Sequence, residues 1–116
     1  MECAFCKIYN QKLPAKIIYQ DNILSCFLPR NMEVYGHLLV IPNKHFENIF
    51  DIPEEELTHI IKFTKKISLH LKECLGATGI NILHASGKSA QQSVPHFHIH
   101  IFPRFDNDSL DTWPKL

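Results

Sequence analysis

Hydrophobic and polar positions along the chain predict a domain of mixed α and β structure with one long helix. Between residues 51 and 76, apolar or small side chains recur every three or four positions, the spacing of one helical face. They are Leu57, Ile60, Ile61, Thr64, Ile67, Leu71, Cys74 and Leu75. Asp51 with Glu54 three residues later has the form of a capping box, and Gly76 suits a helix end. We therefore expect a helix over residues 51–76.

Short apolar runs elsewhere predict five strands. They cover residues 16–20, 23–28, 36–42, 79–85 and 94–103. Asp21 and Asn22 form a turn pair, so the first two runs are expected to form a hairpin. A short helix is predicted within residues 43–50. One long helix between the third and fourth strands favours an α+β fold in which a five-stranded antiparallel sheet carries the helix on one face. The length of 116 residues fits a single domain, residues 1–116.

Composition narrows the classes of partner. The chain is 45% hydrophobic and has 12 basic and 12 acidic residues, so no basic excess points to nucleic acid. No apolar run approaches the ~20 residues needed to span a membrane, and the first residues do not resemble a signal peptide. We expect a cytoplasmic protein. In that compartment the Cys3-x-x-Cys6 pair indicates a metal site, a redox pair or chance, and Cys26 and Cys74 are expected to be small buried residues.

The segment "VPHFHIHIFPR" is the strongest chemical signal. His96, His98 and His100 alternate with apolar residues, so on a strand the three imidazoles share one face and the apolar side chains share the other. The apolar face belongs against the core, and the imidazole face should point to water, a pocket or a metal. Two chemistries are consistent with this pattern: three imidazoles on one metal ion, or one imidazole acting as a nucleophile towards phosphorus.

These residues resemble a known family. The pattern H-φ-H-φ-H-φ-φ, with φ apolar, is the signature of the histidine triad (HIT) nucleotide hydrolases and transferases, and "HFHIHIF" matches it at each position. "GHLLVIPNKHFENI" and "GINILHASGKSAQQSV" resemble the family's strand-and-turn and phosphate-loop segments, in the family's order. The chain is similar to the zinc-containing bacterial type. His37 also matches a family position and is expected to be structural.

The resemblance implies a mechanism. His98 would attack the α-phosphate of a nucleoside phosphoramidate or dinucleoside polyphosphate, giving a nucleotidyl-histidine that water hydrolyses to a nucleoside monophosphate, AMP being expected. His100 would bind phosphate oxygens and stabilise charge, Gln92 would bind an α-phosphate oxygen, and Ser93 would donate a proton towards the leaving group. Backbone N–H groups of residues 86–89 are further donors to phosphate. The family also implies a homodimer that joins two sheets.

The resemblance also supplies partners for the cysteine pair. Some family members carry a structural zinc ion on a C-x-x-C pair, a histidine after the "IP-x-K" turn and the first histidine of the triad. The matching residues are Cys3, Cys6, His45 and His96. Two thiolates and two imidazoles complete a tetrahedral zinc site, which leaves no open position for water.

Two departures from the family keep alternatives open. Pro29 stands where many members bind the ribose through Asp or Asn, and Ala85 stands where Asn or Gln is usual. One alternative is a nucleotide-binding module with weak or no turnover. Independently of these departures, the three imidazoles leave open a metallohydrolase that holds a catalytic metal on all of them.

Overall fold

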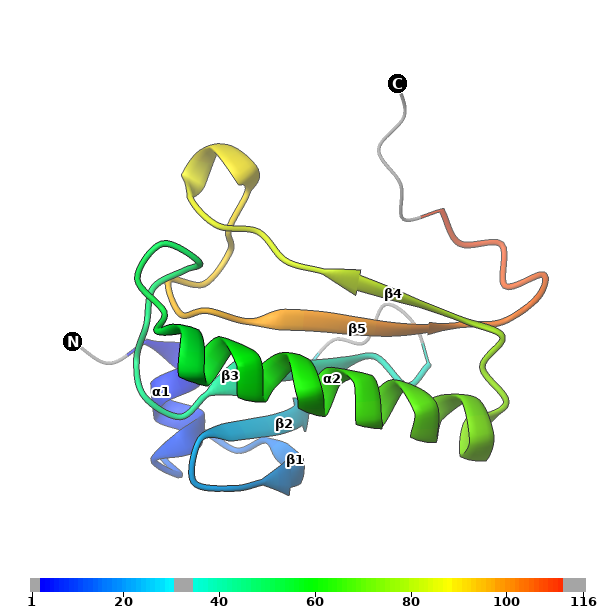
Figure 1. Ribbon diagram of the computed structural model, residues 1–116, viewed down its shortest axis with the longest axis horizontal. Helices are drawn as coiled ribbons and strands as arrows, with labels where there is room; N and C mark the ends of the chain where they lie inside the picture. The colour runs from blue at the N-terminus through cyan, green and yellow to red at the C-terminus, as the bar shows by residue number, and fades with distance from the viewer. Residues whose placement is uncertain (1–2, 31–34, 112–116) are drawn as a thin grey trace.

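Five antiparallel strands form one sheet in the order β1-β2-β3-β5-β4 (Figure 1). This computed structural model describes residues 3–30 and 35–111. The strands are β1 (Lys16–Gln20), β2 (Leu24–Leu28), β3 (Leu38–Pro42), β4 (Gly79–Leu83) and β5 (Ile99–Arg104). The α+β fold with a five-stranded antiparallel sheet is therefore confirmed, and so is the hairpin, whose turn is fixed by Asp21 Oδ1 accepting from the N–H groups of Ile23 and Leu24.

The long helix α2 (Glu54–Leu75) lies across one face of the sheet (Figure 1). Its apolar stripe buries Ile60, Thr64 and Leu71 against the strands, as the spacing predicts, whereas Ile61, also expected on this face, is 50% exposed. Gly76 follows with φ of +78° and ends the helix, which confirms the predicted stop. No helix within the described residues combines the length and the apolar character needed to cross a bilayer.

The capping box predicted at the start of this helix is wrong. The helix begins at Glu54 after Pro53, and no side chain caps it. Asp51 instead belongs to the turn before the helix, where its carboxylate accepts from the N–H groups of Glu47 and Asn48 at 3.0 and 2.8 Å. The carboxylate that the sequence pattern assigns to the helix is thus already engaged in organising the preceding loop.

The predicted short helix over residues 43–50 is also wrong, because that segment forms bends and a turn. Short helices lie elsewhere: α1 (Ala4–Tyr9) and the 3₁₀ turn η1 (Lys88–Ala90). Because α1 packs on the sheet face opposite α2, the sheet is covered on both sides near the end of β3. The buried residues on the α1 side are Phe5, Phe27, Leu39 and Ile41.

The last strand starts later than predicted. β5 begins at Ile99 and not at residue 94, because residues 94–98 pair with loops; the N–H of Phe97, for example, donates to the carbonyl of Phe46. Cys26 is fully buried in β2, as expected, whereas Cys74 is exposed on α2 and the prediction that it is buried is wrong.

Candidate active site

His96, His98 and His100 lie where β5 begins, and α1 covers the first two. The Phe5 ring from α1 packs edge-on against both His96 and His98, with ring centroids 5.9 and 5.1 Å apart. His98 and His100 are neighbours with centroids at 5.0 Å. His96 is 0% exposed and His98 is 3% exposed. The His96 and His98 rings are therefore covered by a helix and shielded from water, whereas His100 is half-buried.

The His98 ring has one engaged nitrogen and one that carries no hydrogen bond. Its Nδ1–H donates to the carbonyl of His96 at 2.7 Å. A carbonyl can only accept, so the proton must sit on Nδ1 and the lone pair on Nε2. Burial lowers the pKa of His98 below its usual 6.5, which outweighs the opposite effect of the bond to His96. A buried, neutral imidazole with a free lone pair is a nucleophile at neutral pH.

His100 is oriented by a fourth histidine. His37 Nε2 lies 3.0 Å from His100 Nδ1, and the two rings lie against Phe102, which stacks with His37 at 4.1 Å between centroids. Burial lowers the pKa of His100 to about 4, with the positive charges that His98, His37 and His84 can carry acting in the same direction. Near pH 7 His100 is therefore neutral, and if Nδ1 accepts from His37, its Nε2 is left as an N–H donor.

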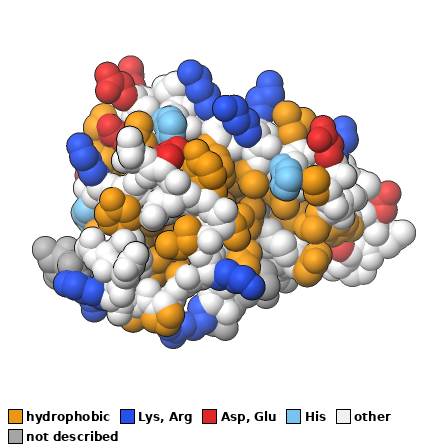
Figure 2. Space-filling model, turned by 90° about the horizontal axis from the view of Figure 1, so that it is seen from below, with side chains coloured by type: hydrophobic (Ala, Val, Ile, Leu, Met, Phe, Trp, Pro, Cys, Tyr) orange, Lys and Arg blue, Asp and Glu red, His pale blue; other side chains and the backbone are white. Residues whose placement is uncertain are grey.

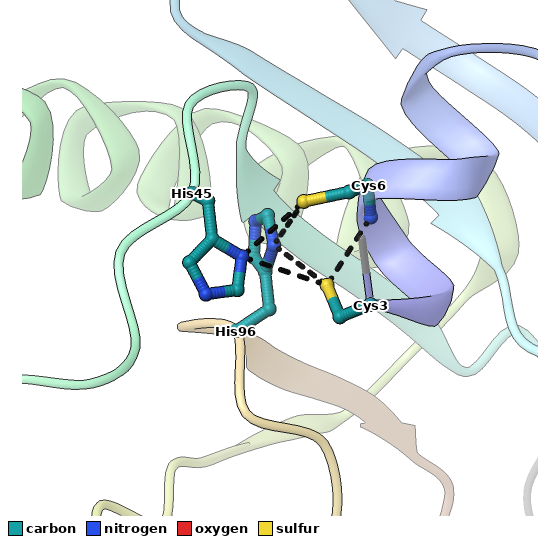
Figure 3. Close-up of side chains that lie close together, drawn as sticks. All are labelled: Cys3, Cys6, His45 and His96. Carbon is teal, nitrogen blue, oxygen red and sulfur yellow. Dashed lines mark hydrogen bonds between the residues drawn. The ribbon is translucent and has the colours of Figure 1, made fainter. Parts of the chain in front are cut away.

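The four residues predicted to hold zinc converge at one point (Figure 3). Their ligand atoms all lie within 4.8 Å of one another. The Nδ1 atom of His96 lies 3.3 and 3.5 Å from the sulfurs of Cys3 and Cys6, and that of His45 lies 3.6 and 3.2 Å from them. Sulfur and nitrogen ligands of one tetrahedral zinc ion stand about 3.5 Å apart, given the usual bond lengths. The donor set and the spacing therefore fit a metal ion.

Local structure explains this convergence. Cys3 caps the N-terminus of α1, its sulfur accepting from the N–H of Cys6 at 3.3 Å, so both thiols face the same side. His96 Nε2–H donates to the carbonyl of Pro42 at 2.9 Å, which turns its Nδ1 lone pair towards the thiols. Burial lowers the pKa of His96 to about 4 and keeps the ring in the neutral form that binds metals.

Gln92 and Ser93 play unequal parts. The Gln92 side chain bonds only within the loop region: its Oε1 accepts from the N–H of Gly87, and its Nε2 donates to the carbonyls of Glu47 and Val94. Ser93 is exposed and lines a hollow of about 540 Å³ beside Cys3, His45 and Glu47. The sequence thus locates both residues next to the triad, whereas the structure shows that the Gln92 amide organises the loop.

A second hollow, beside Phe5, is not predicted from the sequence. It measures about 530 Å³ and is lined mostly by apolar side chains, among them Phe5, Ile8, Phe27, Pro29 and Leu39. Phe5 lines this cavity and also touches the His98 ring, so one side chain connects the cavity to the candidate nucleophile, although His98 itself is not among the lining residues. The apolar residues that line the cavity are visible in the sequence of the N-terminal segment and the second strand. Only the packing of α1 on the sheet brings them together.

Three comparisons connect these features to known proteins. A family model described as "HIT domain" matches residues 10–107. An uncharacterized HIT-like protein from Methanocaldococcus jannaschii is 44% identical over 91% of this chain and 81% of its own length. An adenosine 5'-monophosphoramidase from Saccharomyces cerevisiae is 32% identical over 97% of this chain and 70% of its own length. A zinc-bound histidine triad family protein from Mycobacterium smegmatis superposes with a TM-score of 0.91 at 34% identity, over 99% of this chain and 84% of that one.

Proposed function

Because the chain belongs to the HIT family, we propose that it is a nucleotide hydrolase in which His98 is the nucleophile. The substrate is a nucleoside phosphoramidate or a dinucleoside polyphosphate, cleaved at the α-phosphate to release a nucleoside monophosphate, AMP in our proposal. The observation that carries this is the His98 ring itself: Nδ1–H is fixed on the His96 carbonyl, and Nε2 keeps its lone pair. The yeast relative named as an adenosine monophosphoramidase supports this substrate class.

In the first step the Nε2 atom of His98 forms a bond to the α-phosphorus while the bond from phosphorus to the leaving nitrogen or oxygen breaks. Ser93, whose hydroxyl is exposed at the edge of a hollow, donates a proton to the leaving group. In the second step water attacks phosphorus and returns a proton to Ser93, the bond from phosphorus to His98 breaks, and the nucleoside monophosphate leaves. His100 donates through Nε2–H to the phosphate oxygens in both steps, and becomes cationic more readily when an anion is bound.

The nucleoside occupies the apolar cavity beside Phe5. Its volume of about 530 Å³ is within the usual range for small-ligand sites, which is about 300–1,000 Å³. Phe5 and Phe27 meet edge to face at 5.5 Å between centroids and offer an aromatic wall to a base. Figure 2, which views the molecule from the β1 side, shows hydrophobic side chains gathered across the middle of this face. Pro29 lines the same cavity and offers no polar side chain to the ribose, so in this chain base contacts carry more of the binding.

Cys3, Cys6, His45 and His96 would hold a structural zinc ion. Bound there, zinc supplies a cross-link between α1, the segment after β3 and the start of β5, because its ligands come from those three places. With four protein ligands there is no free coordination position, so the ion serves stability and not water activation. Through α1 it also keeps Phe5 on the His98 ring.

The protein also forms a homodimer in this proposal. Strand β4 pairs with β5 on one side only, and its other edge carries the exposed apolar residues Ile82 and Leu83, at 52% and 38% exposure. Leu69 on α2 is 49% exposed as well. An unprotected strand edge with apolar side chains favours pairing with a second sheet. Neither nucleic acid nor a membrane is among the proposed partners.

A single-turnover experiment tests the proposal. The protein is mixed with adenosine 5'-phosphoramidate or a dinucleoside polyphosphate, quenched rapidly and analysed by intact mass. A nucleotidyl adduct is expected on the wild type and on His70→Phe, an exposed control on α2, and none on His98→Asn. Asn can still donate to the His96 carbonyl, so the variant should fold while lacking the nucleophile.

Two outcomes would favour the alternatives. Nucleotide binding without any adduct would indicate a binding module, in line with Pro29 and Ala85. Immediate loss of turnover on chelation, with the fold intact and His98→Asn active, would indicate a metallohydrolase. The geometry disfavours the latter, because His96 Nδ1 faces the thiols while His98 Nδ1 and His100 Nδ1 face a carbonyl and His37.

A further inference from the structure

The His84 side chain forms a hydrogen bond with the backbone of His98. His84 follows β4, and its ring lies against the buried Phe97 with centroids 4.5 Å apart and the two planes tilted by 32°. Its Nδ1 lies 2.8 Å from the carbonyl oxygen of His98, the residue that carries the nucleophile. Its Nε2 lies 2.5 Å from the hydroxyl of Ser86, which in turn accepts from the N–H of Ile49 at 2.9 Å.

The partners assign each proton in this chain of hydrogen bonds. A carbonyl only accepts, so His84 Nδ1 carries the proton and donates to His98. In the neutral ring Nε2 is then an acceptor, and the hydroxyl of Ser86 donates to it. Ser86 accepts from Ile49 with its lone pair. The three hydrogen bonds run in one direction, from the N–H of Ile49 through Ser86 and His84 to the carbonyl of His98.

The carbonyl of His98 has need of such a partner. The ladder between β4 and β5 ends at the pair Leu83 and His100, and the ladder between β3 and β5 ends at Val40 and Ile99. His98 therefore lies just beyond both ladders, at the point where a strand normally frays. Ala85, next to His84, has no polar group to offer. The His84 side chain supplies the hydrogen bond that strand pairing does not.

We propose that His84, supported by Ser86, is a positioning residue for the reaction: it fixes the main chain of His98 and so the direction in which Nε2 points. This inference rests on the proposed function of His98. His84 lies on the Phe97 side of the strand end. Its effect on the position of His98 therefore passes through the backbone and not through contact with the substrate.

The consequence is a loss of rate without an equal loss of affinity. When the hydrogen bond is removed, His98 can shift, and a misplacement of about 1 Å at a reacting group costs up to roughly 100-fold in rate. Binding of the nucleoside depends on the apolar cavity around Phe5 and Phe27, which His84 does not line. KM should therefore stay near that of the wild type.

The experiment compares His84→Phe, His84→Asn and Ser86→Ala, with His70→Phe on α2 as the matched control. Phe keeps the contact with Phe97 but cannot donate, whereas Asn can place its amide N–H where Nδ1–H stood. We expect His84→Phe to slow formation of the nucleotidyl-His98 adduct by about 10- to 100-fold with KM little changed. His84→Asn should recover most of the rate, Ser86→Ala should show a smaller loss, and the control should match the wild type.

The carbonyl ¹³C chemical shift of His98 gives a readout that does not depend on turnover. It should move in His84→Phe and return towards the wild-type value in His84→Asn. A wild-type adduct rate in His84→Phe, or equal rates in the Phe and Asn variants, would overturn the role of His84. If the wild type forms no adduct at all, the function proposed for His98 fails. The carbonyl shift then still tests the contact from His84: a shift that does not move in His84→Phe would overturn the contact, and one that moves would support it.

Discussion

Withdrawal of the proposed zinc ion should open α1 while the sheet stays folded. The helix has 6 residues, well below the length at which an isolated helix is stable in water. Ordering its backbone costs roughly 6 kcal/mol or more, at about 1–2 kcal/mol per residue. Burial of Phe5 returns about 1.5–3 kcal/mol, and the half-buried Ile8 returns less. Without a metal on Cys3 and Cys6, the segment therefore falls short by a few kcal/mol.

Hydrogen exchange read by mass spectrometry measures this directly. The N–H of Lys7 donates to the carbonyl of Cys3 and that of Asn10 to Cys6, so both amides report on α1. Chelation should lower the free energy of opening α1 by about 3 kcal/mol, so these amides should exchange roughly 100-fold faster. Peptides from β2, β3 and α2 should not change. Unchanged protection of α1 after proven zinc removal, or cooperative unfolding of the sheet, would refute the reasoning.

Three further predictions follow from single sites. Gly36→Ala should lower the free energy of unfolding in urea by more than about 2 kcal/mol, because φ is +82° and the added carbon would lie 2.9 Å from Cγ of Pro103 in β5. The control Gly76→Ala has no atom within 4 Å of the added carbon and should lower it by only about 1 kcal/mol. Adduct formation should stay constant as pH falls from 8 to 6.5 and decline only below, because burial lowers the pKa of His98 and the lone pair is lost only on protonation; a decline centred above pH 6.5 would contradict this. Asp51→Ala should lower the free energy of unfolding by about 1 kcal/mol, because the N–H groups of Glu47 and Asn48 lose their acceptor. Glu54→Gln should leave it unchanged, because Glu54 takes part in no capping box. Calorimetry that finds Glu54→Gln the more destabilising of the two would contradict the assignment.

The parts of the fold that follow from local periodicity could be predicted from the sequence. The apolar stripe of residues 57–75, the stop at Gly76 and the hairpin at Asp21 depend on neighbours in the chain, and the structure confirms them. The failures have two causes: a competing local partner at Asp51, and a position at the border of the apolar face at Cys74. Asp51 has a cap-like spacing to Glu54, but the N–H groups of the preceding turn take its carboxylate first. Cys74 continues the apolar spacing of α2, yet it lies on the exposed side.

The candidate site divides in the same way. The convergence of Cys3, Cys6, His45 and His96 could be predicted only through the resemblance to the HIT family, because the cysteine pair alone leaves a metal site, a redox pair and chance open. The contribution of Phe5 could not, because an apolar residue between two cysteines carries no chemical signal until the helix folds over His98. Such contacts depend on tertiary packing, which no pattern of neighbouring residues encodes.

The two restraints on His98 act on different parts of the residue, and together they decide which atom the proposed substrate would meet. Phe5 holds the ring edge-on from the α1 side, and the carbonyl of His96 fixes Nδ1, so ring rotation is blocked. His84 holds the main-chain carbonyl of the same residue from the opposite side of the strand end. Only Nε2 is left without a partner. A nucleophile fixed at both the ring and the backbone needs little reorganisation before attack, because the entropy of orientation is lost on folding and not on binding. Under the proposed function, a polar ribose contact at Pro29 is then less necessary, since alignment with phosphorus would depend first on where the imidazole is held.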